Sequence, residues 1–409
     1  MQKNLRVDGS RLHHSIDELA QIGALEGGGV CRLAFTRADK DGRDYVESRM
    51  RSLGLQIRVD GIGNLMGIRA GLTQEATVAC GSHSDTVATG GRFDGSVGVL
   101  AGLEVMEVLN EAQVTTRRPL AVIDFVNEEG ARFMPDMMGS LVVRGDLKVE
   151  ESRRIAGIDG ILLGEDLDRF GFGGGDDFGK DPIGCYVELH IEQGPVLEQE
   201  SMNIGVVEGV QGIRWIAFTL RGAAAHAGAT PIHLRHDAAY VAGEIVRCAR
   251  RFSMEIAGQR ATVGSLSLLP NLVNVVAEEA RLTVDLRNPD VARLGRAEDE
   301  LYRFVNQTAA AEGVLVESEK RVDVAPVTFD LGMVSEVDAA AHSLGYSSMR
   351  MISGAGHDAQ IMAEVCPTAM IFIPSRAGVS HNIHEYTAPE DIERGANVLL
   401  QTLLSLAGE

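Results

Sequence analysis

The chain has 409 residues, which is enough for two or three domains, and 45% of them are hydrophobic, so a buried core is expected. Charged residues make up 23%, and no apolar run reaches the roughly 18 residues of a membrane-spanning helix, which argues against disorder and membrane insertion. The formal charge of -20 would repel phosphates and anionic lipids, so we expect neither nucleic acid nor a membrane as partner. The N-terminal residues lack a secretory signal, and the five cysteines lack the spacing of a disulfide framework, so we expect a cytoplasmic protein with reduced thiols.

Short apolar runs that alternate with helical patterns indicate the main fold. Residues 76–80 are typical of a buried strand, residues 97–111 have the periodicity of a helix, and residues 119–126 form another apolar run. Further strand-like runs occur at 185–191, 348–353 and 367–373. Strands that alternate with helices predict an α/β domain with a mainly parallel sheet covered by helices.

The segment 212–325 has a different pattern and is predicted to be an inserted domain. Its order of elements is β-α-β-β-α-β, the ferredoxin-like arrangement of a small sheet and a helical layer. The predicted strands are 213–221, 261–269, 275–287 and 314–319, and the predicted helices are 236–251 and 293–313. The main domain is then built from residues 1–211 and 326–409, and it contains a Gly/Asp-rich loop at 171–184.

Histidine and carboxylate residues follow several of the predicted strands. In GSHSDT (81–86), His83 and Asp85 leave the carboxyl edge of the sheet, where α/β proteins form their ligand sites. A carboxylate beside a metal-binding imidazole can fix the tautomer of the ring, but a turn histidine capped by an aspartate has the same pattern. Asp94 of GGRFDG precedes a helix, either as a ligand over the sheet edge or as an N-cap.

The adjacent Glu128 and Glu129 follow the apolar run at 119–126. Two like charges at the end of a buried strand raise the pKa of one of them unless a cation lies close by. In that setting one glutamate can bind a metal while its neighbour acts as a general base.

Two later strands also end in polar residues. After the strand at 185–191, the alternation of an extended chain sends His190 and Glu192 to one side and Gln193 to the other, unless the chain bends. His381 and His384 follow the strand at 367–373, and one of them can complete a metal site.

Taken together, five strand ends each supply a histidine or a carboxylate, which is unexpected for a chain with eleven histidines. Nitrogen and oxygen donors without a thiolate suit zinc, manganese, cobalt or nickel rather than an iron–sulfur centre. The set predicts a hydrolytic site with two metal ions, in which one carboxylate bridges the ions. Its candidate ligands are His83, Asp94, Glu129, His190 and His381.

The combined motifs resemble the amidohydrolase branch of the M20 metallopeptidase family, and they extend over nearly the whole chain. This branch includes N-carbamoyl-L-amino-acid hydrolases, β-ureidopropionases and allantoate amidohydrolases. The motifs are GSHSDTVATGGRFDGSVGVLAGL, FVNEEGARFMPDMMGS, LHIEQGPVLE, GAAAHAGATP, SGAGHDA and GVSHNIHEYT. The resemblance implies a catalytic α/β domain with two divalent metal ions per subunit, and an inserted lid that also forms the contact of a homodimer.

The resemblance also implies a role for each motif residue. Asp94 would bridge the two ions, His83 and His190 would bind one, and Glu129 and His381 would bind the other. Asp85 would act with His83 at the catalytic site. Glu128 would be the general base, which takes a proton from the attacking water and returns it to the leaving nitrogen. His384 lies where the family needs no ligand, so we expect it to be a bystander.

Substrate contacts follow from the same resemblance. Arg287 of VDLRN is expected to bind a substrate carboxylate, because a guanidinium can make two parallel hydrogen bonds to it, although a solvated surface arginine is the ordinary alternative. His226 of AAAHAG would reach the scissile group of the partner subunit as an electrophilic donor. The other expected contacts are Gln193, Asn274, Gly356 and His357.

The sequence therefore predicts a metal-dependent amidohydrolase that cleaves the ureido C–N bond of an N-carbamoyl amino acid to give the amino acid, carbon dioxide and ammonia. The nearest alternative is an allantoate or ureidoglycolate amidohydrolase. An aminoacylase or peptidase of the same superfamily is less well supported, because LHIEQG carries histidine where many such relatives carry a carboxylate. A non-catalytic binding protein would have no reason to keep Glu128 beside a complete set of ligands.

Overall fold

The computed structural model describes residues 5–178 and 182–408, and the chain divides into two compact units. The main unit comprises Met1–Glu208 and Thr328–Glu409, and the insert unit comprises Gly209–Val327. The predicted boundaries were at 212 and 325. The predicted loop at 171–184 falls partly outside the described residues, which omit 179–181.

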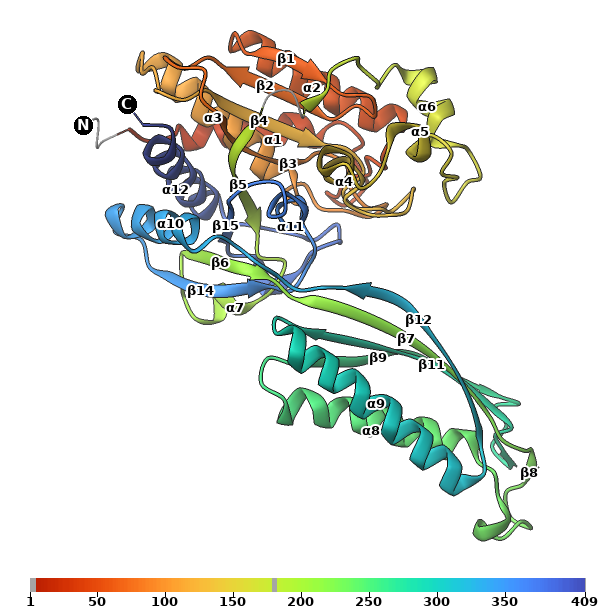
Figure 1. Cartoon of the computed structure of the whole chain (residues 1–409). Helices are drawn as coiled ribbons and strands as arrows, with labels where there is room; N and C mark the ends of the chain where they lie inside the picture. Colours follow the sequence, from red (N-terminus) through yellow and green to blue (C-terminus); the bar gives the residue numbers. More distant parts are fainter. Residues whose placement is uncertain (1–4, 179–181, 409) are drawn as a thin grey trace. The chain divides into compact units, whose positions relative to one another are not determined.

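The main unit contains a nine-stranded sheet with the order β1-β2-β4-β3-β5-β15-β6-β13, and β14 pairs with β6 (Figure 1). Its strands are β1 (Gln56–Val59), β2 (Leu65–Arg69), β3 (Thr77–His83), β4 (Leu120–Phe125), β5 (Ile183–Ile191), β6 (Ile204–Val210), β13 (Val327–Thr328), β14 (Ser348–Ser353) and β15 (Thr368–Ile373). Its helices are α1 (Gly9–Ala20), α2 (Arg37–Ser52), α3 (Ser96–Glu111), α4 (Met138–Arg144), α5 (Val149–Ser152), α6 (Leu163–Phe170), α7 (Val196–Gln199), α10 (Leu331–Ser343), α11 (Asp358–Met362), the 3-10 turn η3 (Arg376–Gly378) and α12 (Pro389–Ala407).

The centre of this sheet is parallel, as the sequence predicted. β4 pairs in parallel with β3, β3 with β5, and β5 with β15. Every residue of β3, β4 and β15 is buried, which is the pattern of strands covered by helices on both faces. Because parallel strands end at the same edge of a sheet, the residues that follow these four strands meet there.

Two glycines of α3 let this helix lie unusually close to the sheet. A Cβ at Gly98 would lie 2.5 Å from the carbonyl oxygen of Leu189, and a Cβ at Gly102 would lie 2.9 Å from Sγ of Cys80. The glycines are four residues apart and therefore share one face of the helix. Their close packing fixes the start of α3, and with it Asp94 two residues earlier, against the carboxyl edge of the sheet.

The insert unit has the predicted β-α-β-β-α-β order. Its four-stranded antiparallel sheet has the order β12-β7-β11-β9, and α8 and α9 pack on one face through a continuous apolar cluster. Its elements are β7 (Gly212–Arg221), β8 (Ala225–His226), η2 (Ile232–Leu234), α8 (Ala238–Glu255), β9 (Arg260–Leu269), β10 (Val275–Val276), β11 (Glu279–Asn288), α9 (Val291–Glu312) and β12 (Leu315–Val324).

One predicted strand of the insert unit is divided in the structure. Residues 275–287 were expected to form a single strand, but Val275 and Val276 pair with β8 instead, while β11 begins at Glu279. Between them, the carbonyls of Ala277 and Glu278 accept hydrogen bonds from Ala238 and Gly222. The chain therefore changes its pairing partner between Val276 and Glu279, from β8 to β7 and β9.

Within the described residues, no helix combines the length and the apolar character that crossing a bilayer needs.

Candidate metal and active site

Residues at the ends of β3 and β5, and residues after β4 and β15, surround a pocket of about 130 Å³ at the carboxyl edge of the main sheet. All of the predicted metal ligands line it, and so does the predicted general base. They are His83, Asp94, Glu129, His190, His381 and Glu128. The structure thus brings together residues that are almost 300 positions apart in the sequence.

Asp94 belongs to two groups of possible metal ligands. One group is His83, Asp94 and His190, and the other is Asp94, Glu129 and His381; within each group the ligand atoms lie within 4.8 Å of one another. Oδ1 of Asp94 lies 3.1 Å from Nε2 of His190, whereas Oδ2 lies 3.4 Å from Nε2 of His381. Each carboxylate oxygen therefore faces one group, which is the arrangement of a bridging ligand.

The two buried histidines are oriented so that Nε2 faces the pocket. Nδ1 of His83 lies 3.0 Å from the backbone carbonyl of Asp85, and Nδ1 of His190 lies 2.8 Å from the carbonyl of Ile191. A carbonyl only accepts hydrogen bonds, so Nδ1 carries the proton and Nε2 keeps its lone pair in the neutral ring. This is how a metal-binding histidine is usually held.

The carboxylate of Asp85 has a different role from the one predicted. It was expected to fix the tautomer of His83, but Oδ1 lies 3.9 Å from Nδ1 of that ring, which is too far for a hydrogen bond. Its oxygens accept instead from the backbone N–H groups of Glu128 at 3.1 Å and Glu129 at 3.4 Å. Asp85 therefore orients the turn that carries the two glutamates.

The electrostatics of the pocket favour a bound cation. Burial raises the pKa of Glu128 well above its usual range, and the nearby charges of Asp358 and Glu129 raise it further. Burial also raises the pKa of Glu129, with a contribution from the charge of Asp94. Burial is the largest single effect on the pKa of His190 and lowers it, but the hydrogen bond and charge of Asp94, together with the charge of Glu188, outweigh burial and raise the pKa to about 9. Divalent cations would relieve the repulsion between these carboxylates, so the donor set fits the predicted metal pair.

Several hydrogen bonds that the sequence did not predict hold Asp94 in place. Nε2 of Gln193 and Oγ of Ser380 each donate to its Oδ2 at 2.9 Å. Oε1 of Glu385 accepts the backbone N–H groups of Phe93 at 3.0 Å and Asp94 at 3.1 Å. Glu385 lies only four residues after His381, so its position near a candidate ligand was the one available signal.

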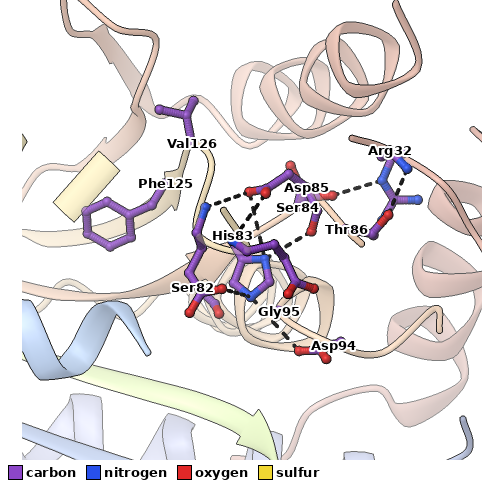
Figure 2. A network of polar contacts seen from close by, with 12 residues as sticks. Arg32, Ser82, His83, Ser84, Asp85, Thr86, Asp94, Gly95, Phe125 and Val126 are labelled. Carbon is purple, nitrogen blue, oxygen red and sulfur yellow. Dashed lines mark hydrogen bonds and ion pairs between the residues drawn. The ribbon is translucent and has the colours of Figure 1, made fainter. Parts of the chain in front are cut away.

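Arg32 lies beside Ser84 and Thr86 and supports the loop after β3 (Figure 2). Its buried guanidinium donates to the carbonyl of Ser84 at 2.9 Å and to Oγ of Ser96 at 3.0 Å. Its backbone N–H donates to Oγ1 of Thr86 at 2.7 Å, and its carbonyl accepts the N–H of Thr86. Arg32 thus links the loop that contains His83 to the first turn of α3. Its sequence context, CRLAF, gives no sign of this role.

The chain bends after β5, which changes the predicted pattern there. Gln193 has a positive φ of 57°, so its side chain turns back toward Asp94. Glu192 points elsewhere, because its carboxylate accepts the N–H groups of Val196 and Leu197 at 2.8 Å. Beyond Ile191 the chain follows the bend that the prediction allowed for, and not the alternation of an extended strand.

A third group of possible ligands, Glu188, His190 and His357, shares His190 with the first. Its other members are already engaged. The oxygens of Glu188 accept from Oγ of Ser82 at 2.7 Å and the N–H of Ala359 at 2.9 Å, and Nε2 of His357 lies 2.9 Å from a serine hydroxyl. This group is therefore better described as the support behind His190.

The predicted substrate contacts are divided between the two units. Gly356 and His357 line the pocket beside Gln193, whereas His226, Asn274 and Arg287 belong to the insert unit. Their roles stay predictions. His384 is exposed, lies in none of the ligand groups, and its backbone N–H donates to Oδ1 of Asn382.

Comparison with known proteins places this geometry in a family. The sequence profile of peptidase family M20/M25/M40 matches residues 79–405, which includes every candidate metal ligand. The chain belongs to this family. The predicted membership and α/β fold are thereby confirmed.

Individual members of the M20 family are similar to this chain over nearly the whole length of both. An N-carbamoyl-L-amino-acid amidohydrolase of Rhizobium meliloti is 39% identical, with 99% of this chain and 98% of that protein covered. An allantoate amidohydrolase of Bacillus subtilis is 32% identical, with 96% of each covered. The crystal structure of a hydantoinase/carbamoylase family amidase from Burkholderia multivorans is 44% identical and has a TM-score of 0.97, with 99% of each chain covered. The prediction of an amidohydrolase is confirmed at this level.

The separation of the two C-terminal histidines gives a test of the ligand set. Replacing His381 by alanine should lower the metal content of the purified protein and abolish hydrolysis, because the group of Asp94 and Glu129 loses its nitrogen donor. Replacing His384 by alanine should leave the metal content unchanged. Elemental analysis of both variants measures this, and metal loss from the His384 variant alone would show that the ligand is misassigned.

Proposed function

We propose that this M20 amidohydrolase hydrolyses the ureido C–N bond of an N-carbamoyl amino acid with two bound divalent metal ions. The main support is the shared position of Asp94 between two ligand groups, with Glu128 in the same pocket. His83, Asp94 and His190 would hold one ion, and Asp94, Glu129 and His381 the other. Zinc, manganese, cobalt and nickel all suit these donors.

The reaction needs an activated water and a polarised carbonyl. The metal pair, when bound, would lower the pKa of water and polarise the carbonyl of the substrate. Glu128 would take a proton from the attacking water and deliver it to the leaving nitrogen. Its Oε2 lies 3.5 Å from Nε2 of His83, so its carboxylate is close to the first ligand group without belonging to either group. Asp85 keeps this base in place through the backbone of the Glu128–Glu129 turn.

We assign recognition of the substrate carboxylate to Arg287. This residue lies on β11 of the insert unit. Nε and Nη2 of its guanidinium donate to the carboxylate of Asp285, two residues earlier on the same strand, at 2.9 to 3.0 Å. Asp285 fixes the plane of the guanidinium in this way, and a fixed plane favours bidentate binding of a second carboxylate. Asn274 is expected to assist from the same unit. Homodimer formation and a cytoplasmic location also stay predictions.

His226 has the tautomer that an electrophilic donor needs. Its Nδ1 accepts the backbone N–H groups of Gly228 at 3.0 Å and Ala229 at 3.1 Å. In the neutral ring the proton therefore lies on Nε2, and the exposed side chain presents it to solvent. Such a group can donate a hydrogen bond to the oxygen that becomes negative during attack on a carbonyl, which supports the proposed role across a dimer.

A substrate panel tests the assignment against its alternatives. The purified enzyme with added manganese or zinc should release ammonia from N-carbamoyl-L-amino acids with a higher kcat/KM than from allantoate or ureidoglycolate. The alternative of an allantoate amidohydrolase is supported by the similarity to the Bacillus subtilis protein of that name. Turnover of allantoate but of no N-carbamoyl amino acid would favour this alternative. Turnover of N-acetyl amino acids or dipeptides alone would instead indicate an aminoacylase or peptidase.

The role of Glu128 is tested by replacing it with glutamine. The amide preserves size but cannot accept a proton, so kcat should fall by about a hundredfold or more while metal content is retained. The Glu129→Gln variant is the matched comparison, and it should lose metal because Glu129 is a candidate ligand. Turnover close to normal in a fully metallated Glu128→Gln enzyme would remove Glu128 from the mechanism.

The role of Arg287 is tested by replacing it with lysine. The charge remains but the planar fork is lost, so kcat/KM should fall by tens of fold, about 1.5 to 3 kcal/mol for a charged hydrogen bond. Metal content should not change. Arg281→Lys is the control, because Arg281 lies on the same strand and pairs with Glu279. Equal effects of the two substitutions would contradict a specific role for Arg287.

A further inference from the structure

Asp136 lines the candidate active-site pocket, and although it lies within the motif FVNEEGARFMPDMMGS, the sequence analysis gave it no role. It lies on the loop between β4 and α4 and remains exposed to solvent. Among the described residues, no lysine, arginine or histidine lies within ion-pair distance of its carboxylate. Apart from a hydrogen bond with its own backbone N–H, this carboxylate can therefore interact with a cation that enters the pocket.

The loop that carries Asp136 is held firmly. Nδ2 of Asn127 donates to the carbonyls of Phe133 at 2.8 Å and Pro135 at 3.1 Å, and the N–H of Met137 donates to the carbonyl of Glu128 at 2.7 Å. A Cβ at Gly130 would lie 2.8 Å from Cα and Cβ of Asp136, so the two turns are in direct contact. The position of Asp136 beside the Glu128–Glu129 turn is therefore set before a substrate binds.

The charge of Asp136 limits which part of a substrate it can face. It would repel a substrate carboxylate, which the proposed function assigns to Arg287 on the insert unit. It is absent from all the groups of possible metal ligands. The ureido group is neutral, and the proposed function places it at the metal ions. The side chain is the part of an N-carbamoyl amino acid that remains, and a carboxylate at the pocket attracts a cation there.

We propose that Asp136 is a specificity-determining residue that favours N-carbamoyl amino acids with a positively charged side chain. This inference rests on the proposed function, because it concerns the substrate of the same pocket. Its contribution is differential: the attraction is present for a side-chain ammonium and absent for an apolar side chain of similar length.

The test compares Nα-carbamoyl-L-lysine with Nα-carbamoyl-L-norleucine, which has a similar length without the charge. The wild-type enzyme should have the higher kcat/KM for the lysine derivative. Asp136→Asn should reduce the lysine-to-norleucine ratio by about fivefold to tenfold, the range between an exposed ion pair and a charged hydrogen bond. Asp136→Lys should reverse the preference toward Nα-carbamoyl-L-glutamate.

The control variant is Glu26→Gln, which removes one exposed carboxylate that does not line this pocket and should leave the ratio unchanged. An unchanged ratio in Asp136→Asn, with norleucine derivative still hydrolysed, would overturn the inference and leave the proposed function intact. An equal loss for all substrates together with lower metal content would also overturn it, because Asp136 would then serve the metal centre. If wild-type enzyme hydrolyses no carbamoyl amino acid, both proposals fail.

Discussion

The carboxylate of Asp94 has to present one oxygen to each of two ligand groups, and much of the main unit can be understood from this requirement. Asp94 lies in a loop, and a loop alone would not hold a carboxylate in one orientation. The close approach of α3 at Gly98 and Gly102 fixes the element that follows it. Glu385 binds its backbone N–H, and Gln193 and Ser380 bind its side chain. The ligand is therefore oriented by the adjacent helix and by two distant segments of the chain, one with Gln193 and one with Ser380 and Glu385.

The need to gather the ligands at one edge of the sheet explains which parts of the site could be predicted from the sequence. Strands such as β3 and β4 are apolar along their whole length, so their positions and their polar ends are readable without tertiary information. Parallel pairing then brings the ends together, and the candidate ligands need only follow directly after the strands. The pocket formed by His83, Glu129 and His190 was predictable because a residue at the end of a parallel strand in the sequence also lies at the shared edge of the sheet.

Sequence reasoning was weaker where tertiary contacts decide the outcome. Arg32 is a buried cation whose partners are backbone carbonyls and one hydroxyl far away in sequence, that of Ser96, and local sequence patterns do not reveal such contacts. Gln193 reaches Asp94 only because the chain adopts a positive φ after β5. Asp85 was assigned to the imidazole of His83 because the two are close in sequence, whereas its carboxylate binds the turn after β4. In each case the contact that decides the side chain's role joins segments that are distant in sequence, and a local sequence pattern contains no information about such a contact.

The division of labour within the pocket follows from these supports. Residues that hold a cation must be rigid, and in the main unit they are fixed by Nδ1–carbonyl contacts, by Asp85 and by Arg32. A residue that distinguishes substrates by charge needs a fixed backbone but a carboxylate without a cationic partner, which is the state of Asp136 among the described residues. The loop can be rigid while this charge stays unpaired, because Asn127 holds the loop through the carbonyls of Phe133 and Pro135, and the carboxylate of Asp136 contacts only its own backbone N–H. The side chain at position 136 can therefore change the substrates accepted without disturbing the ligands that the chemistry requires.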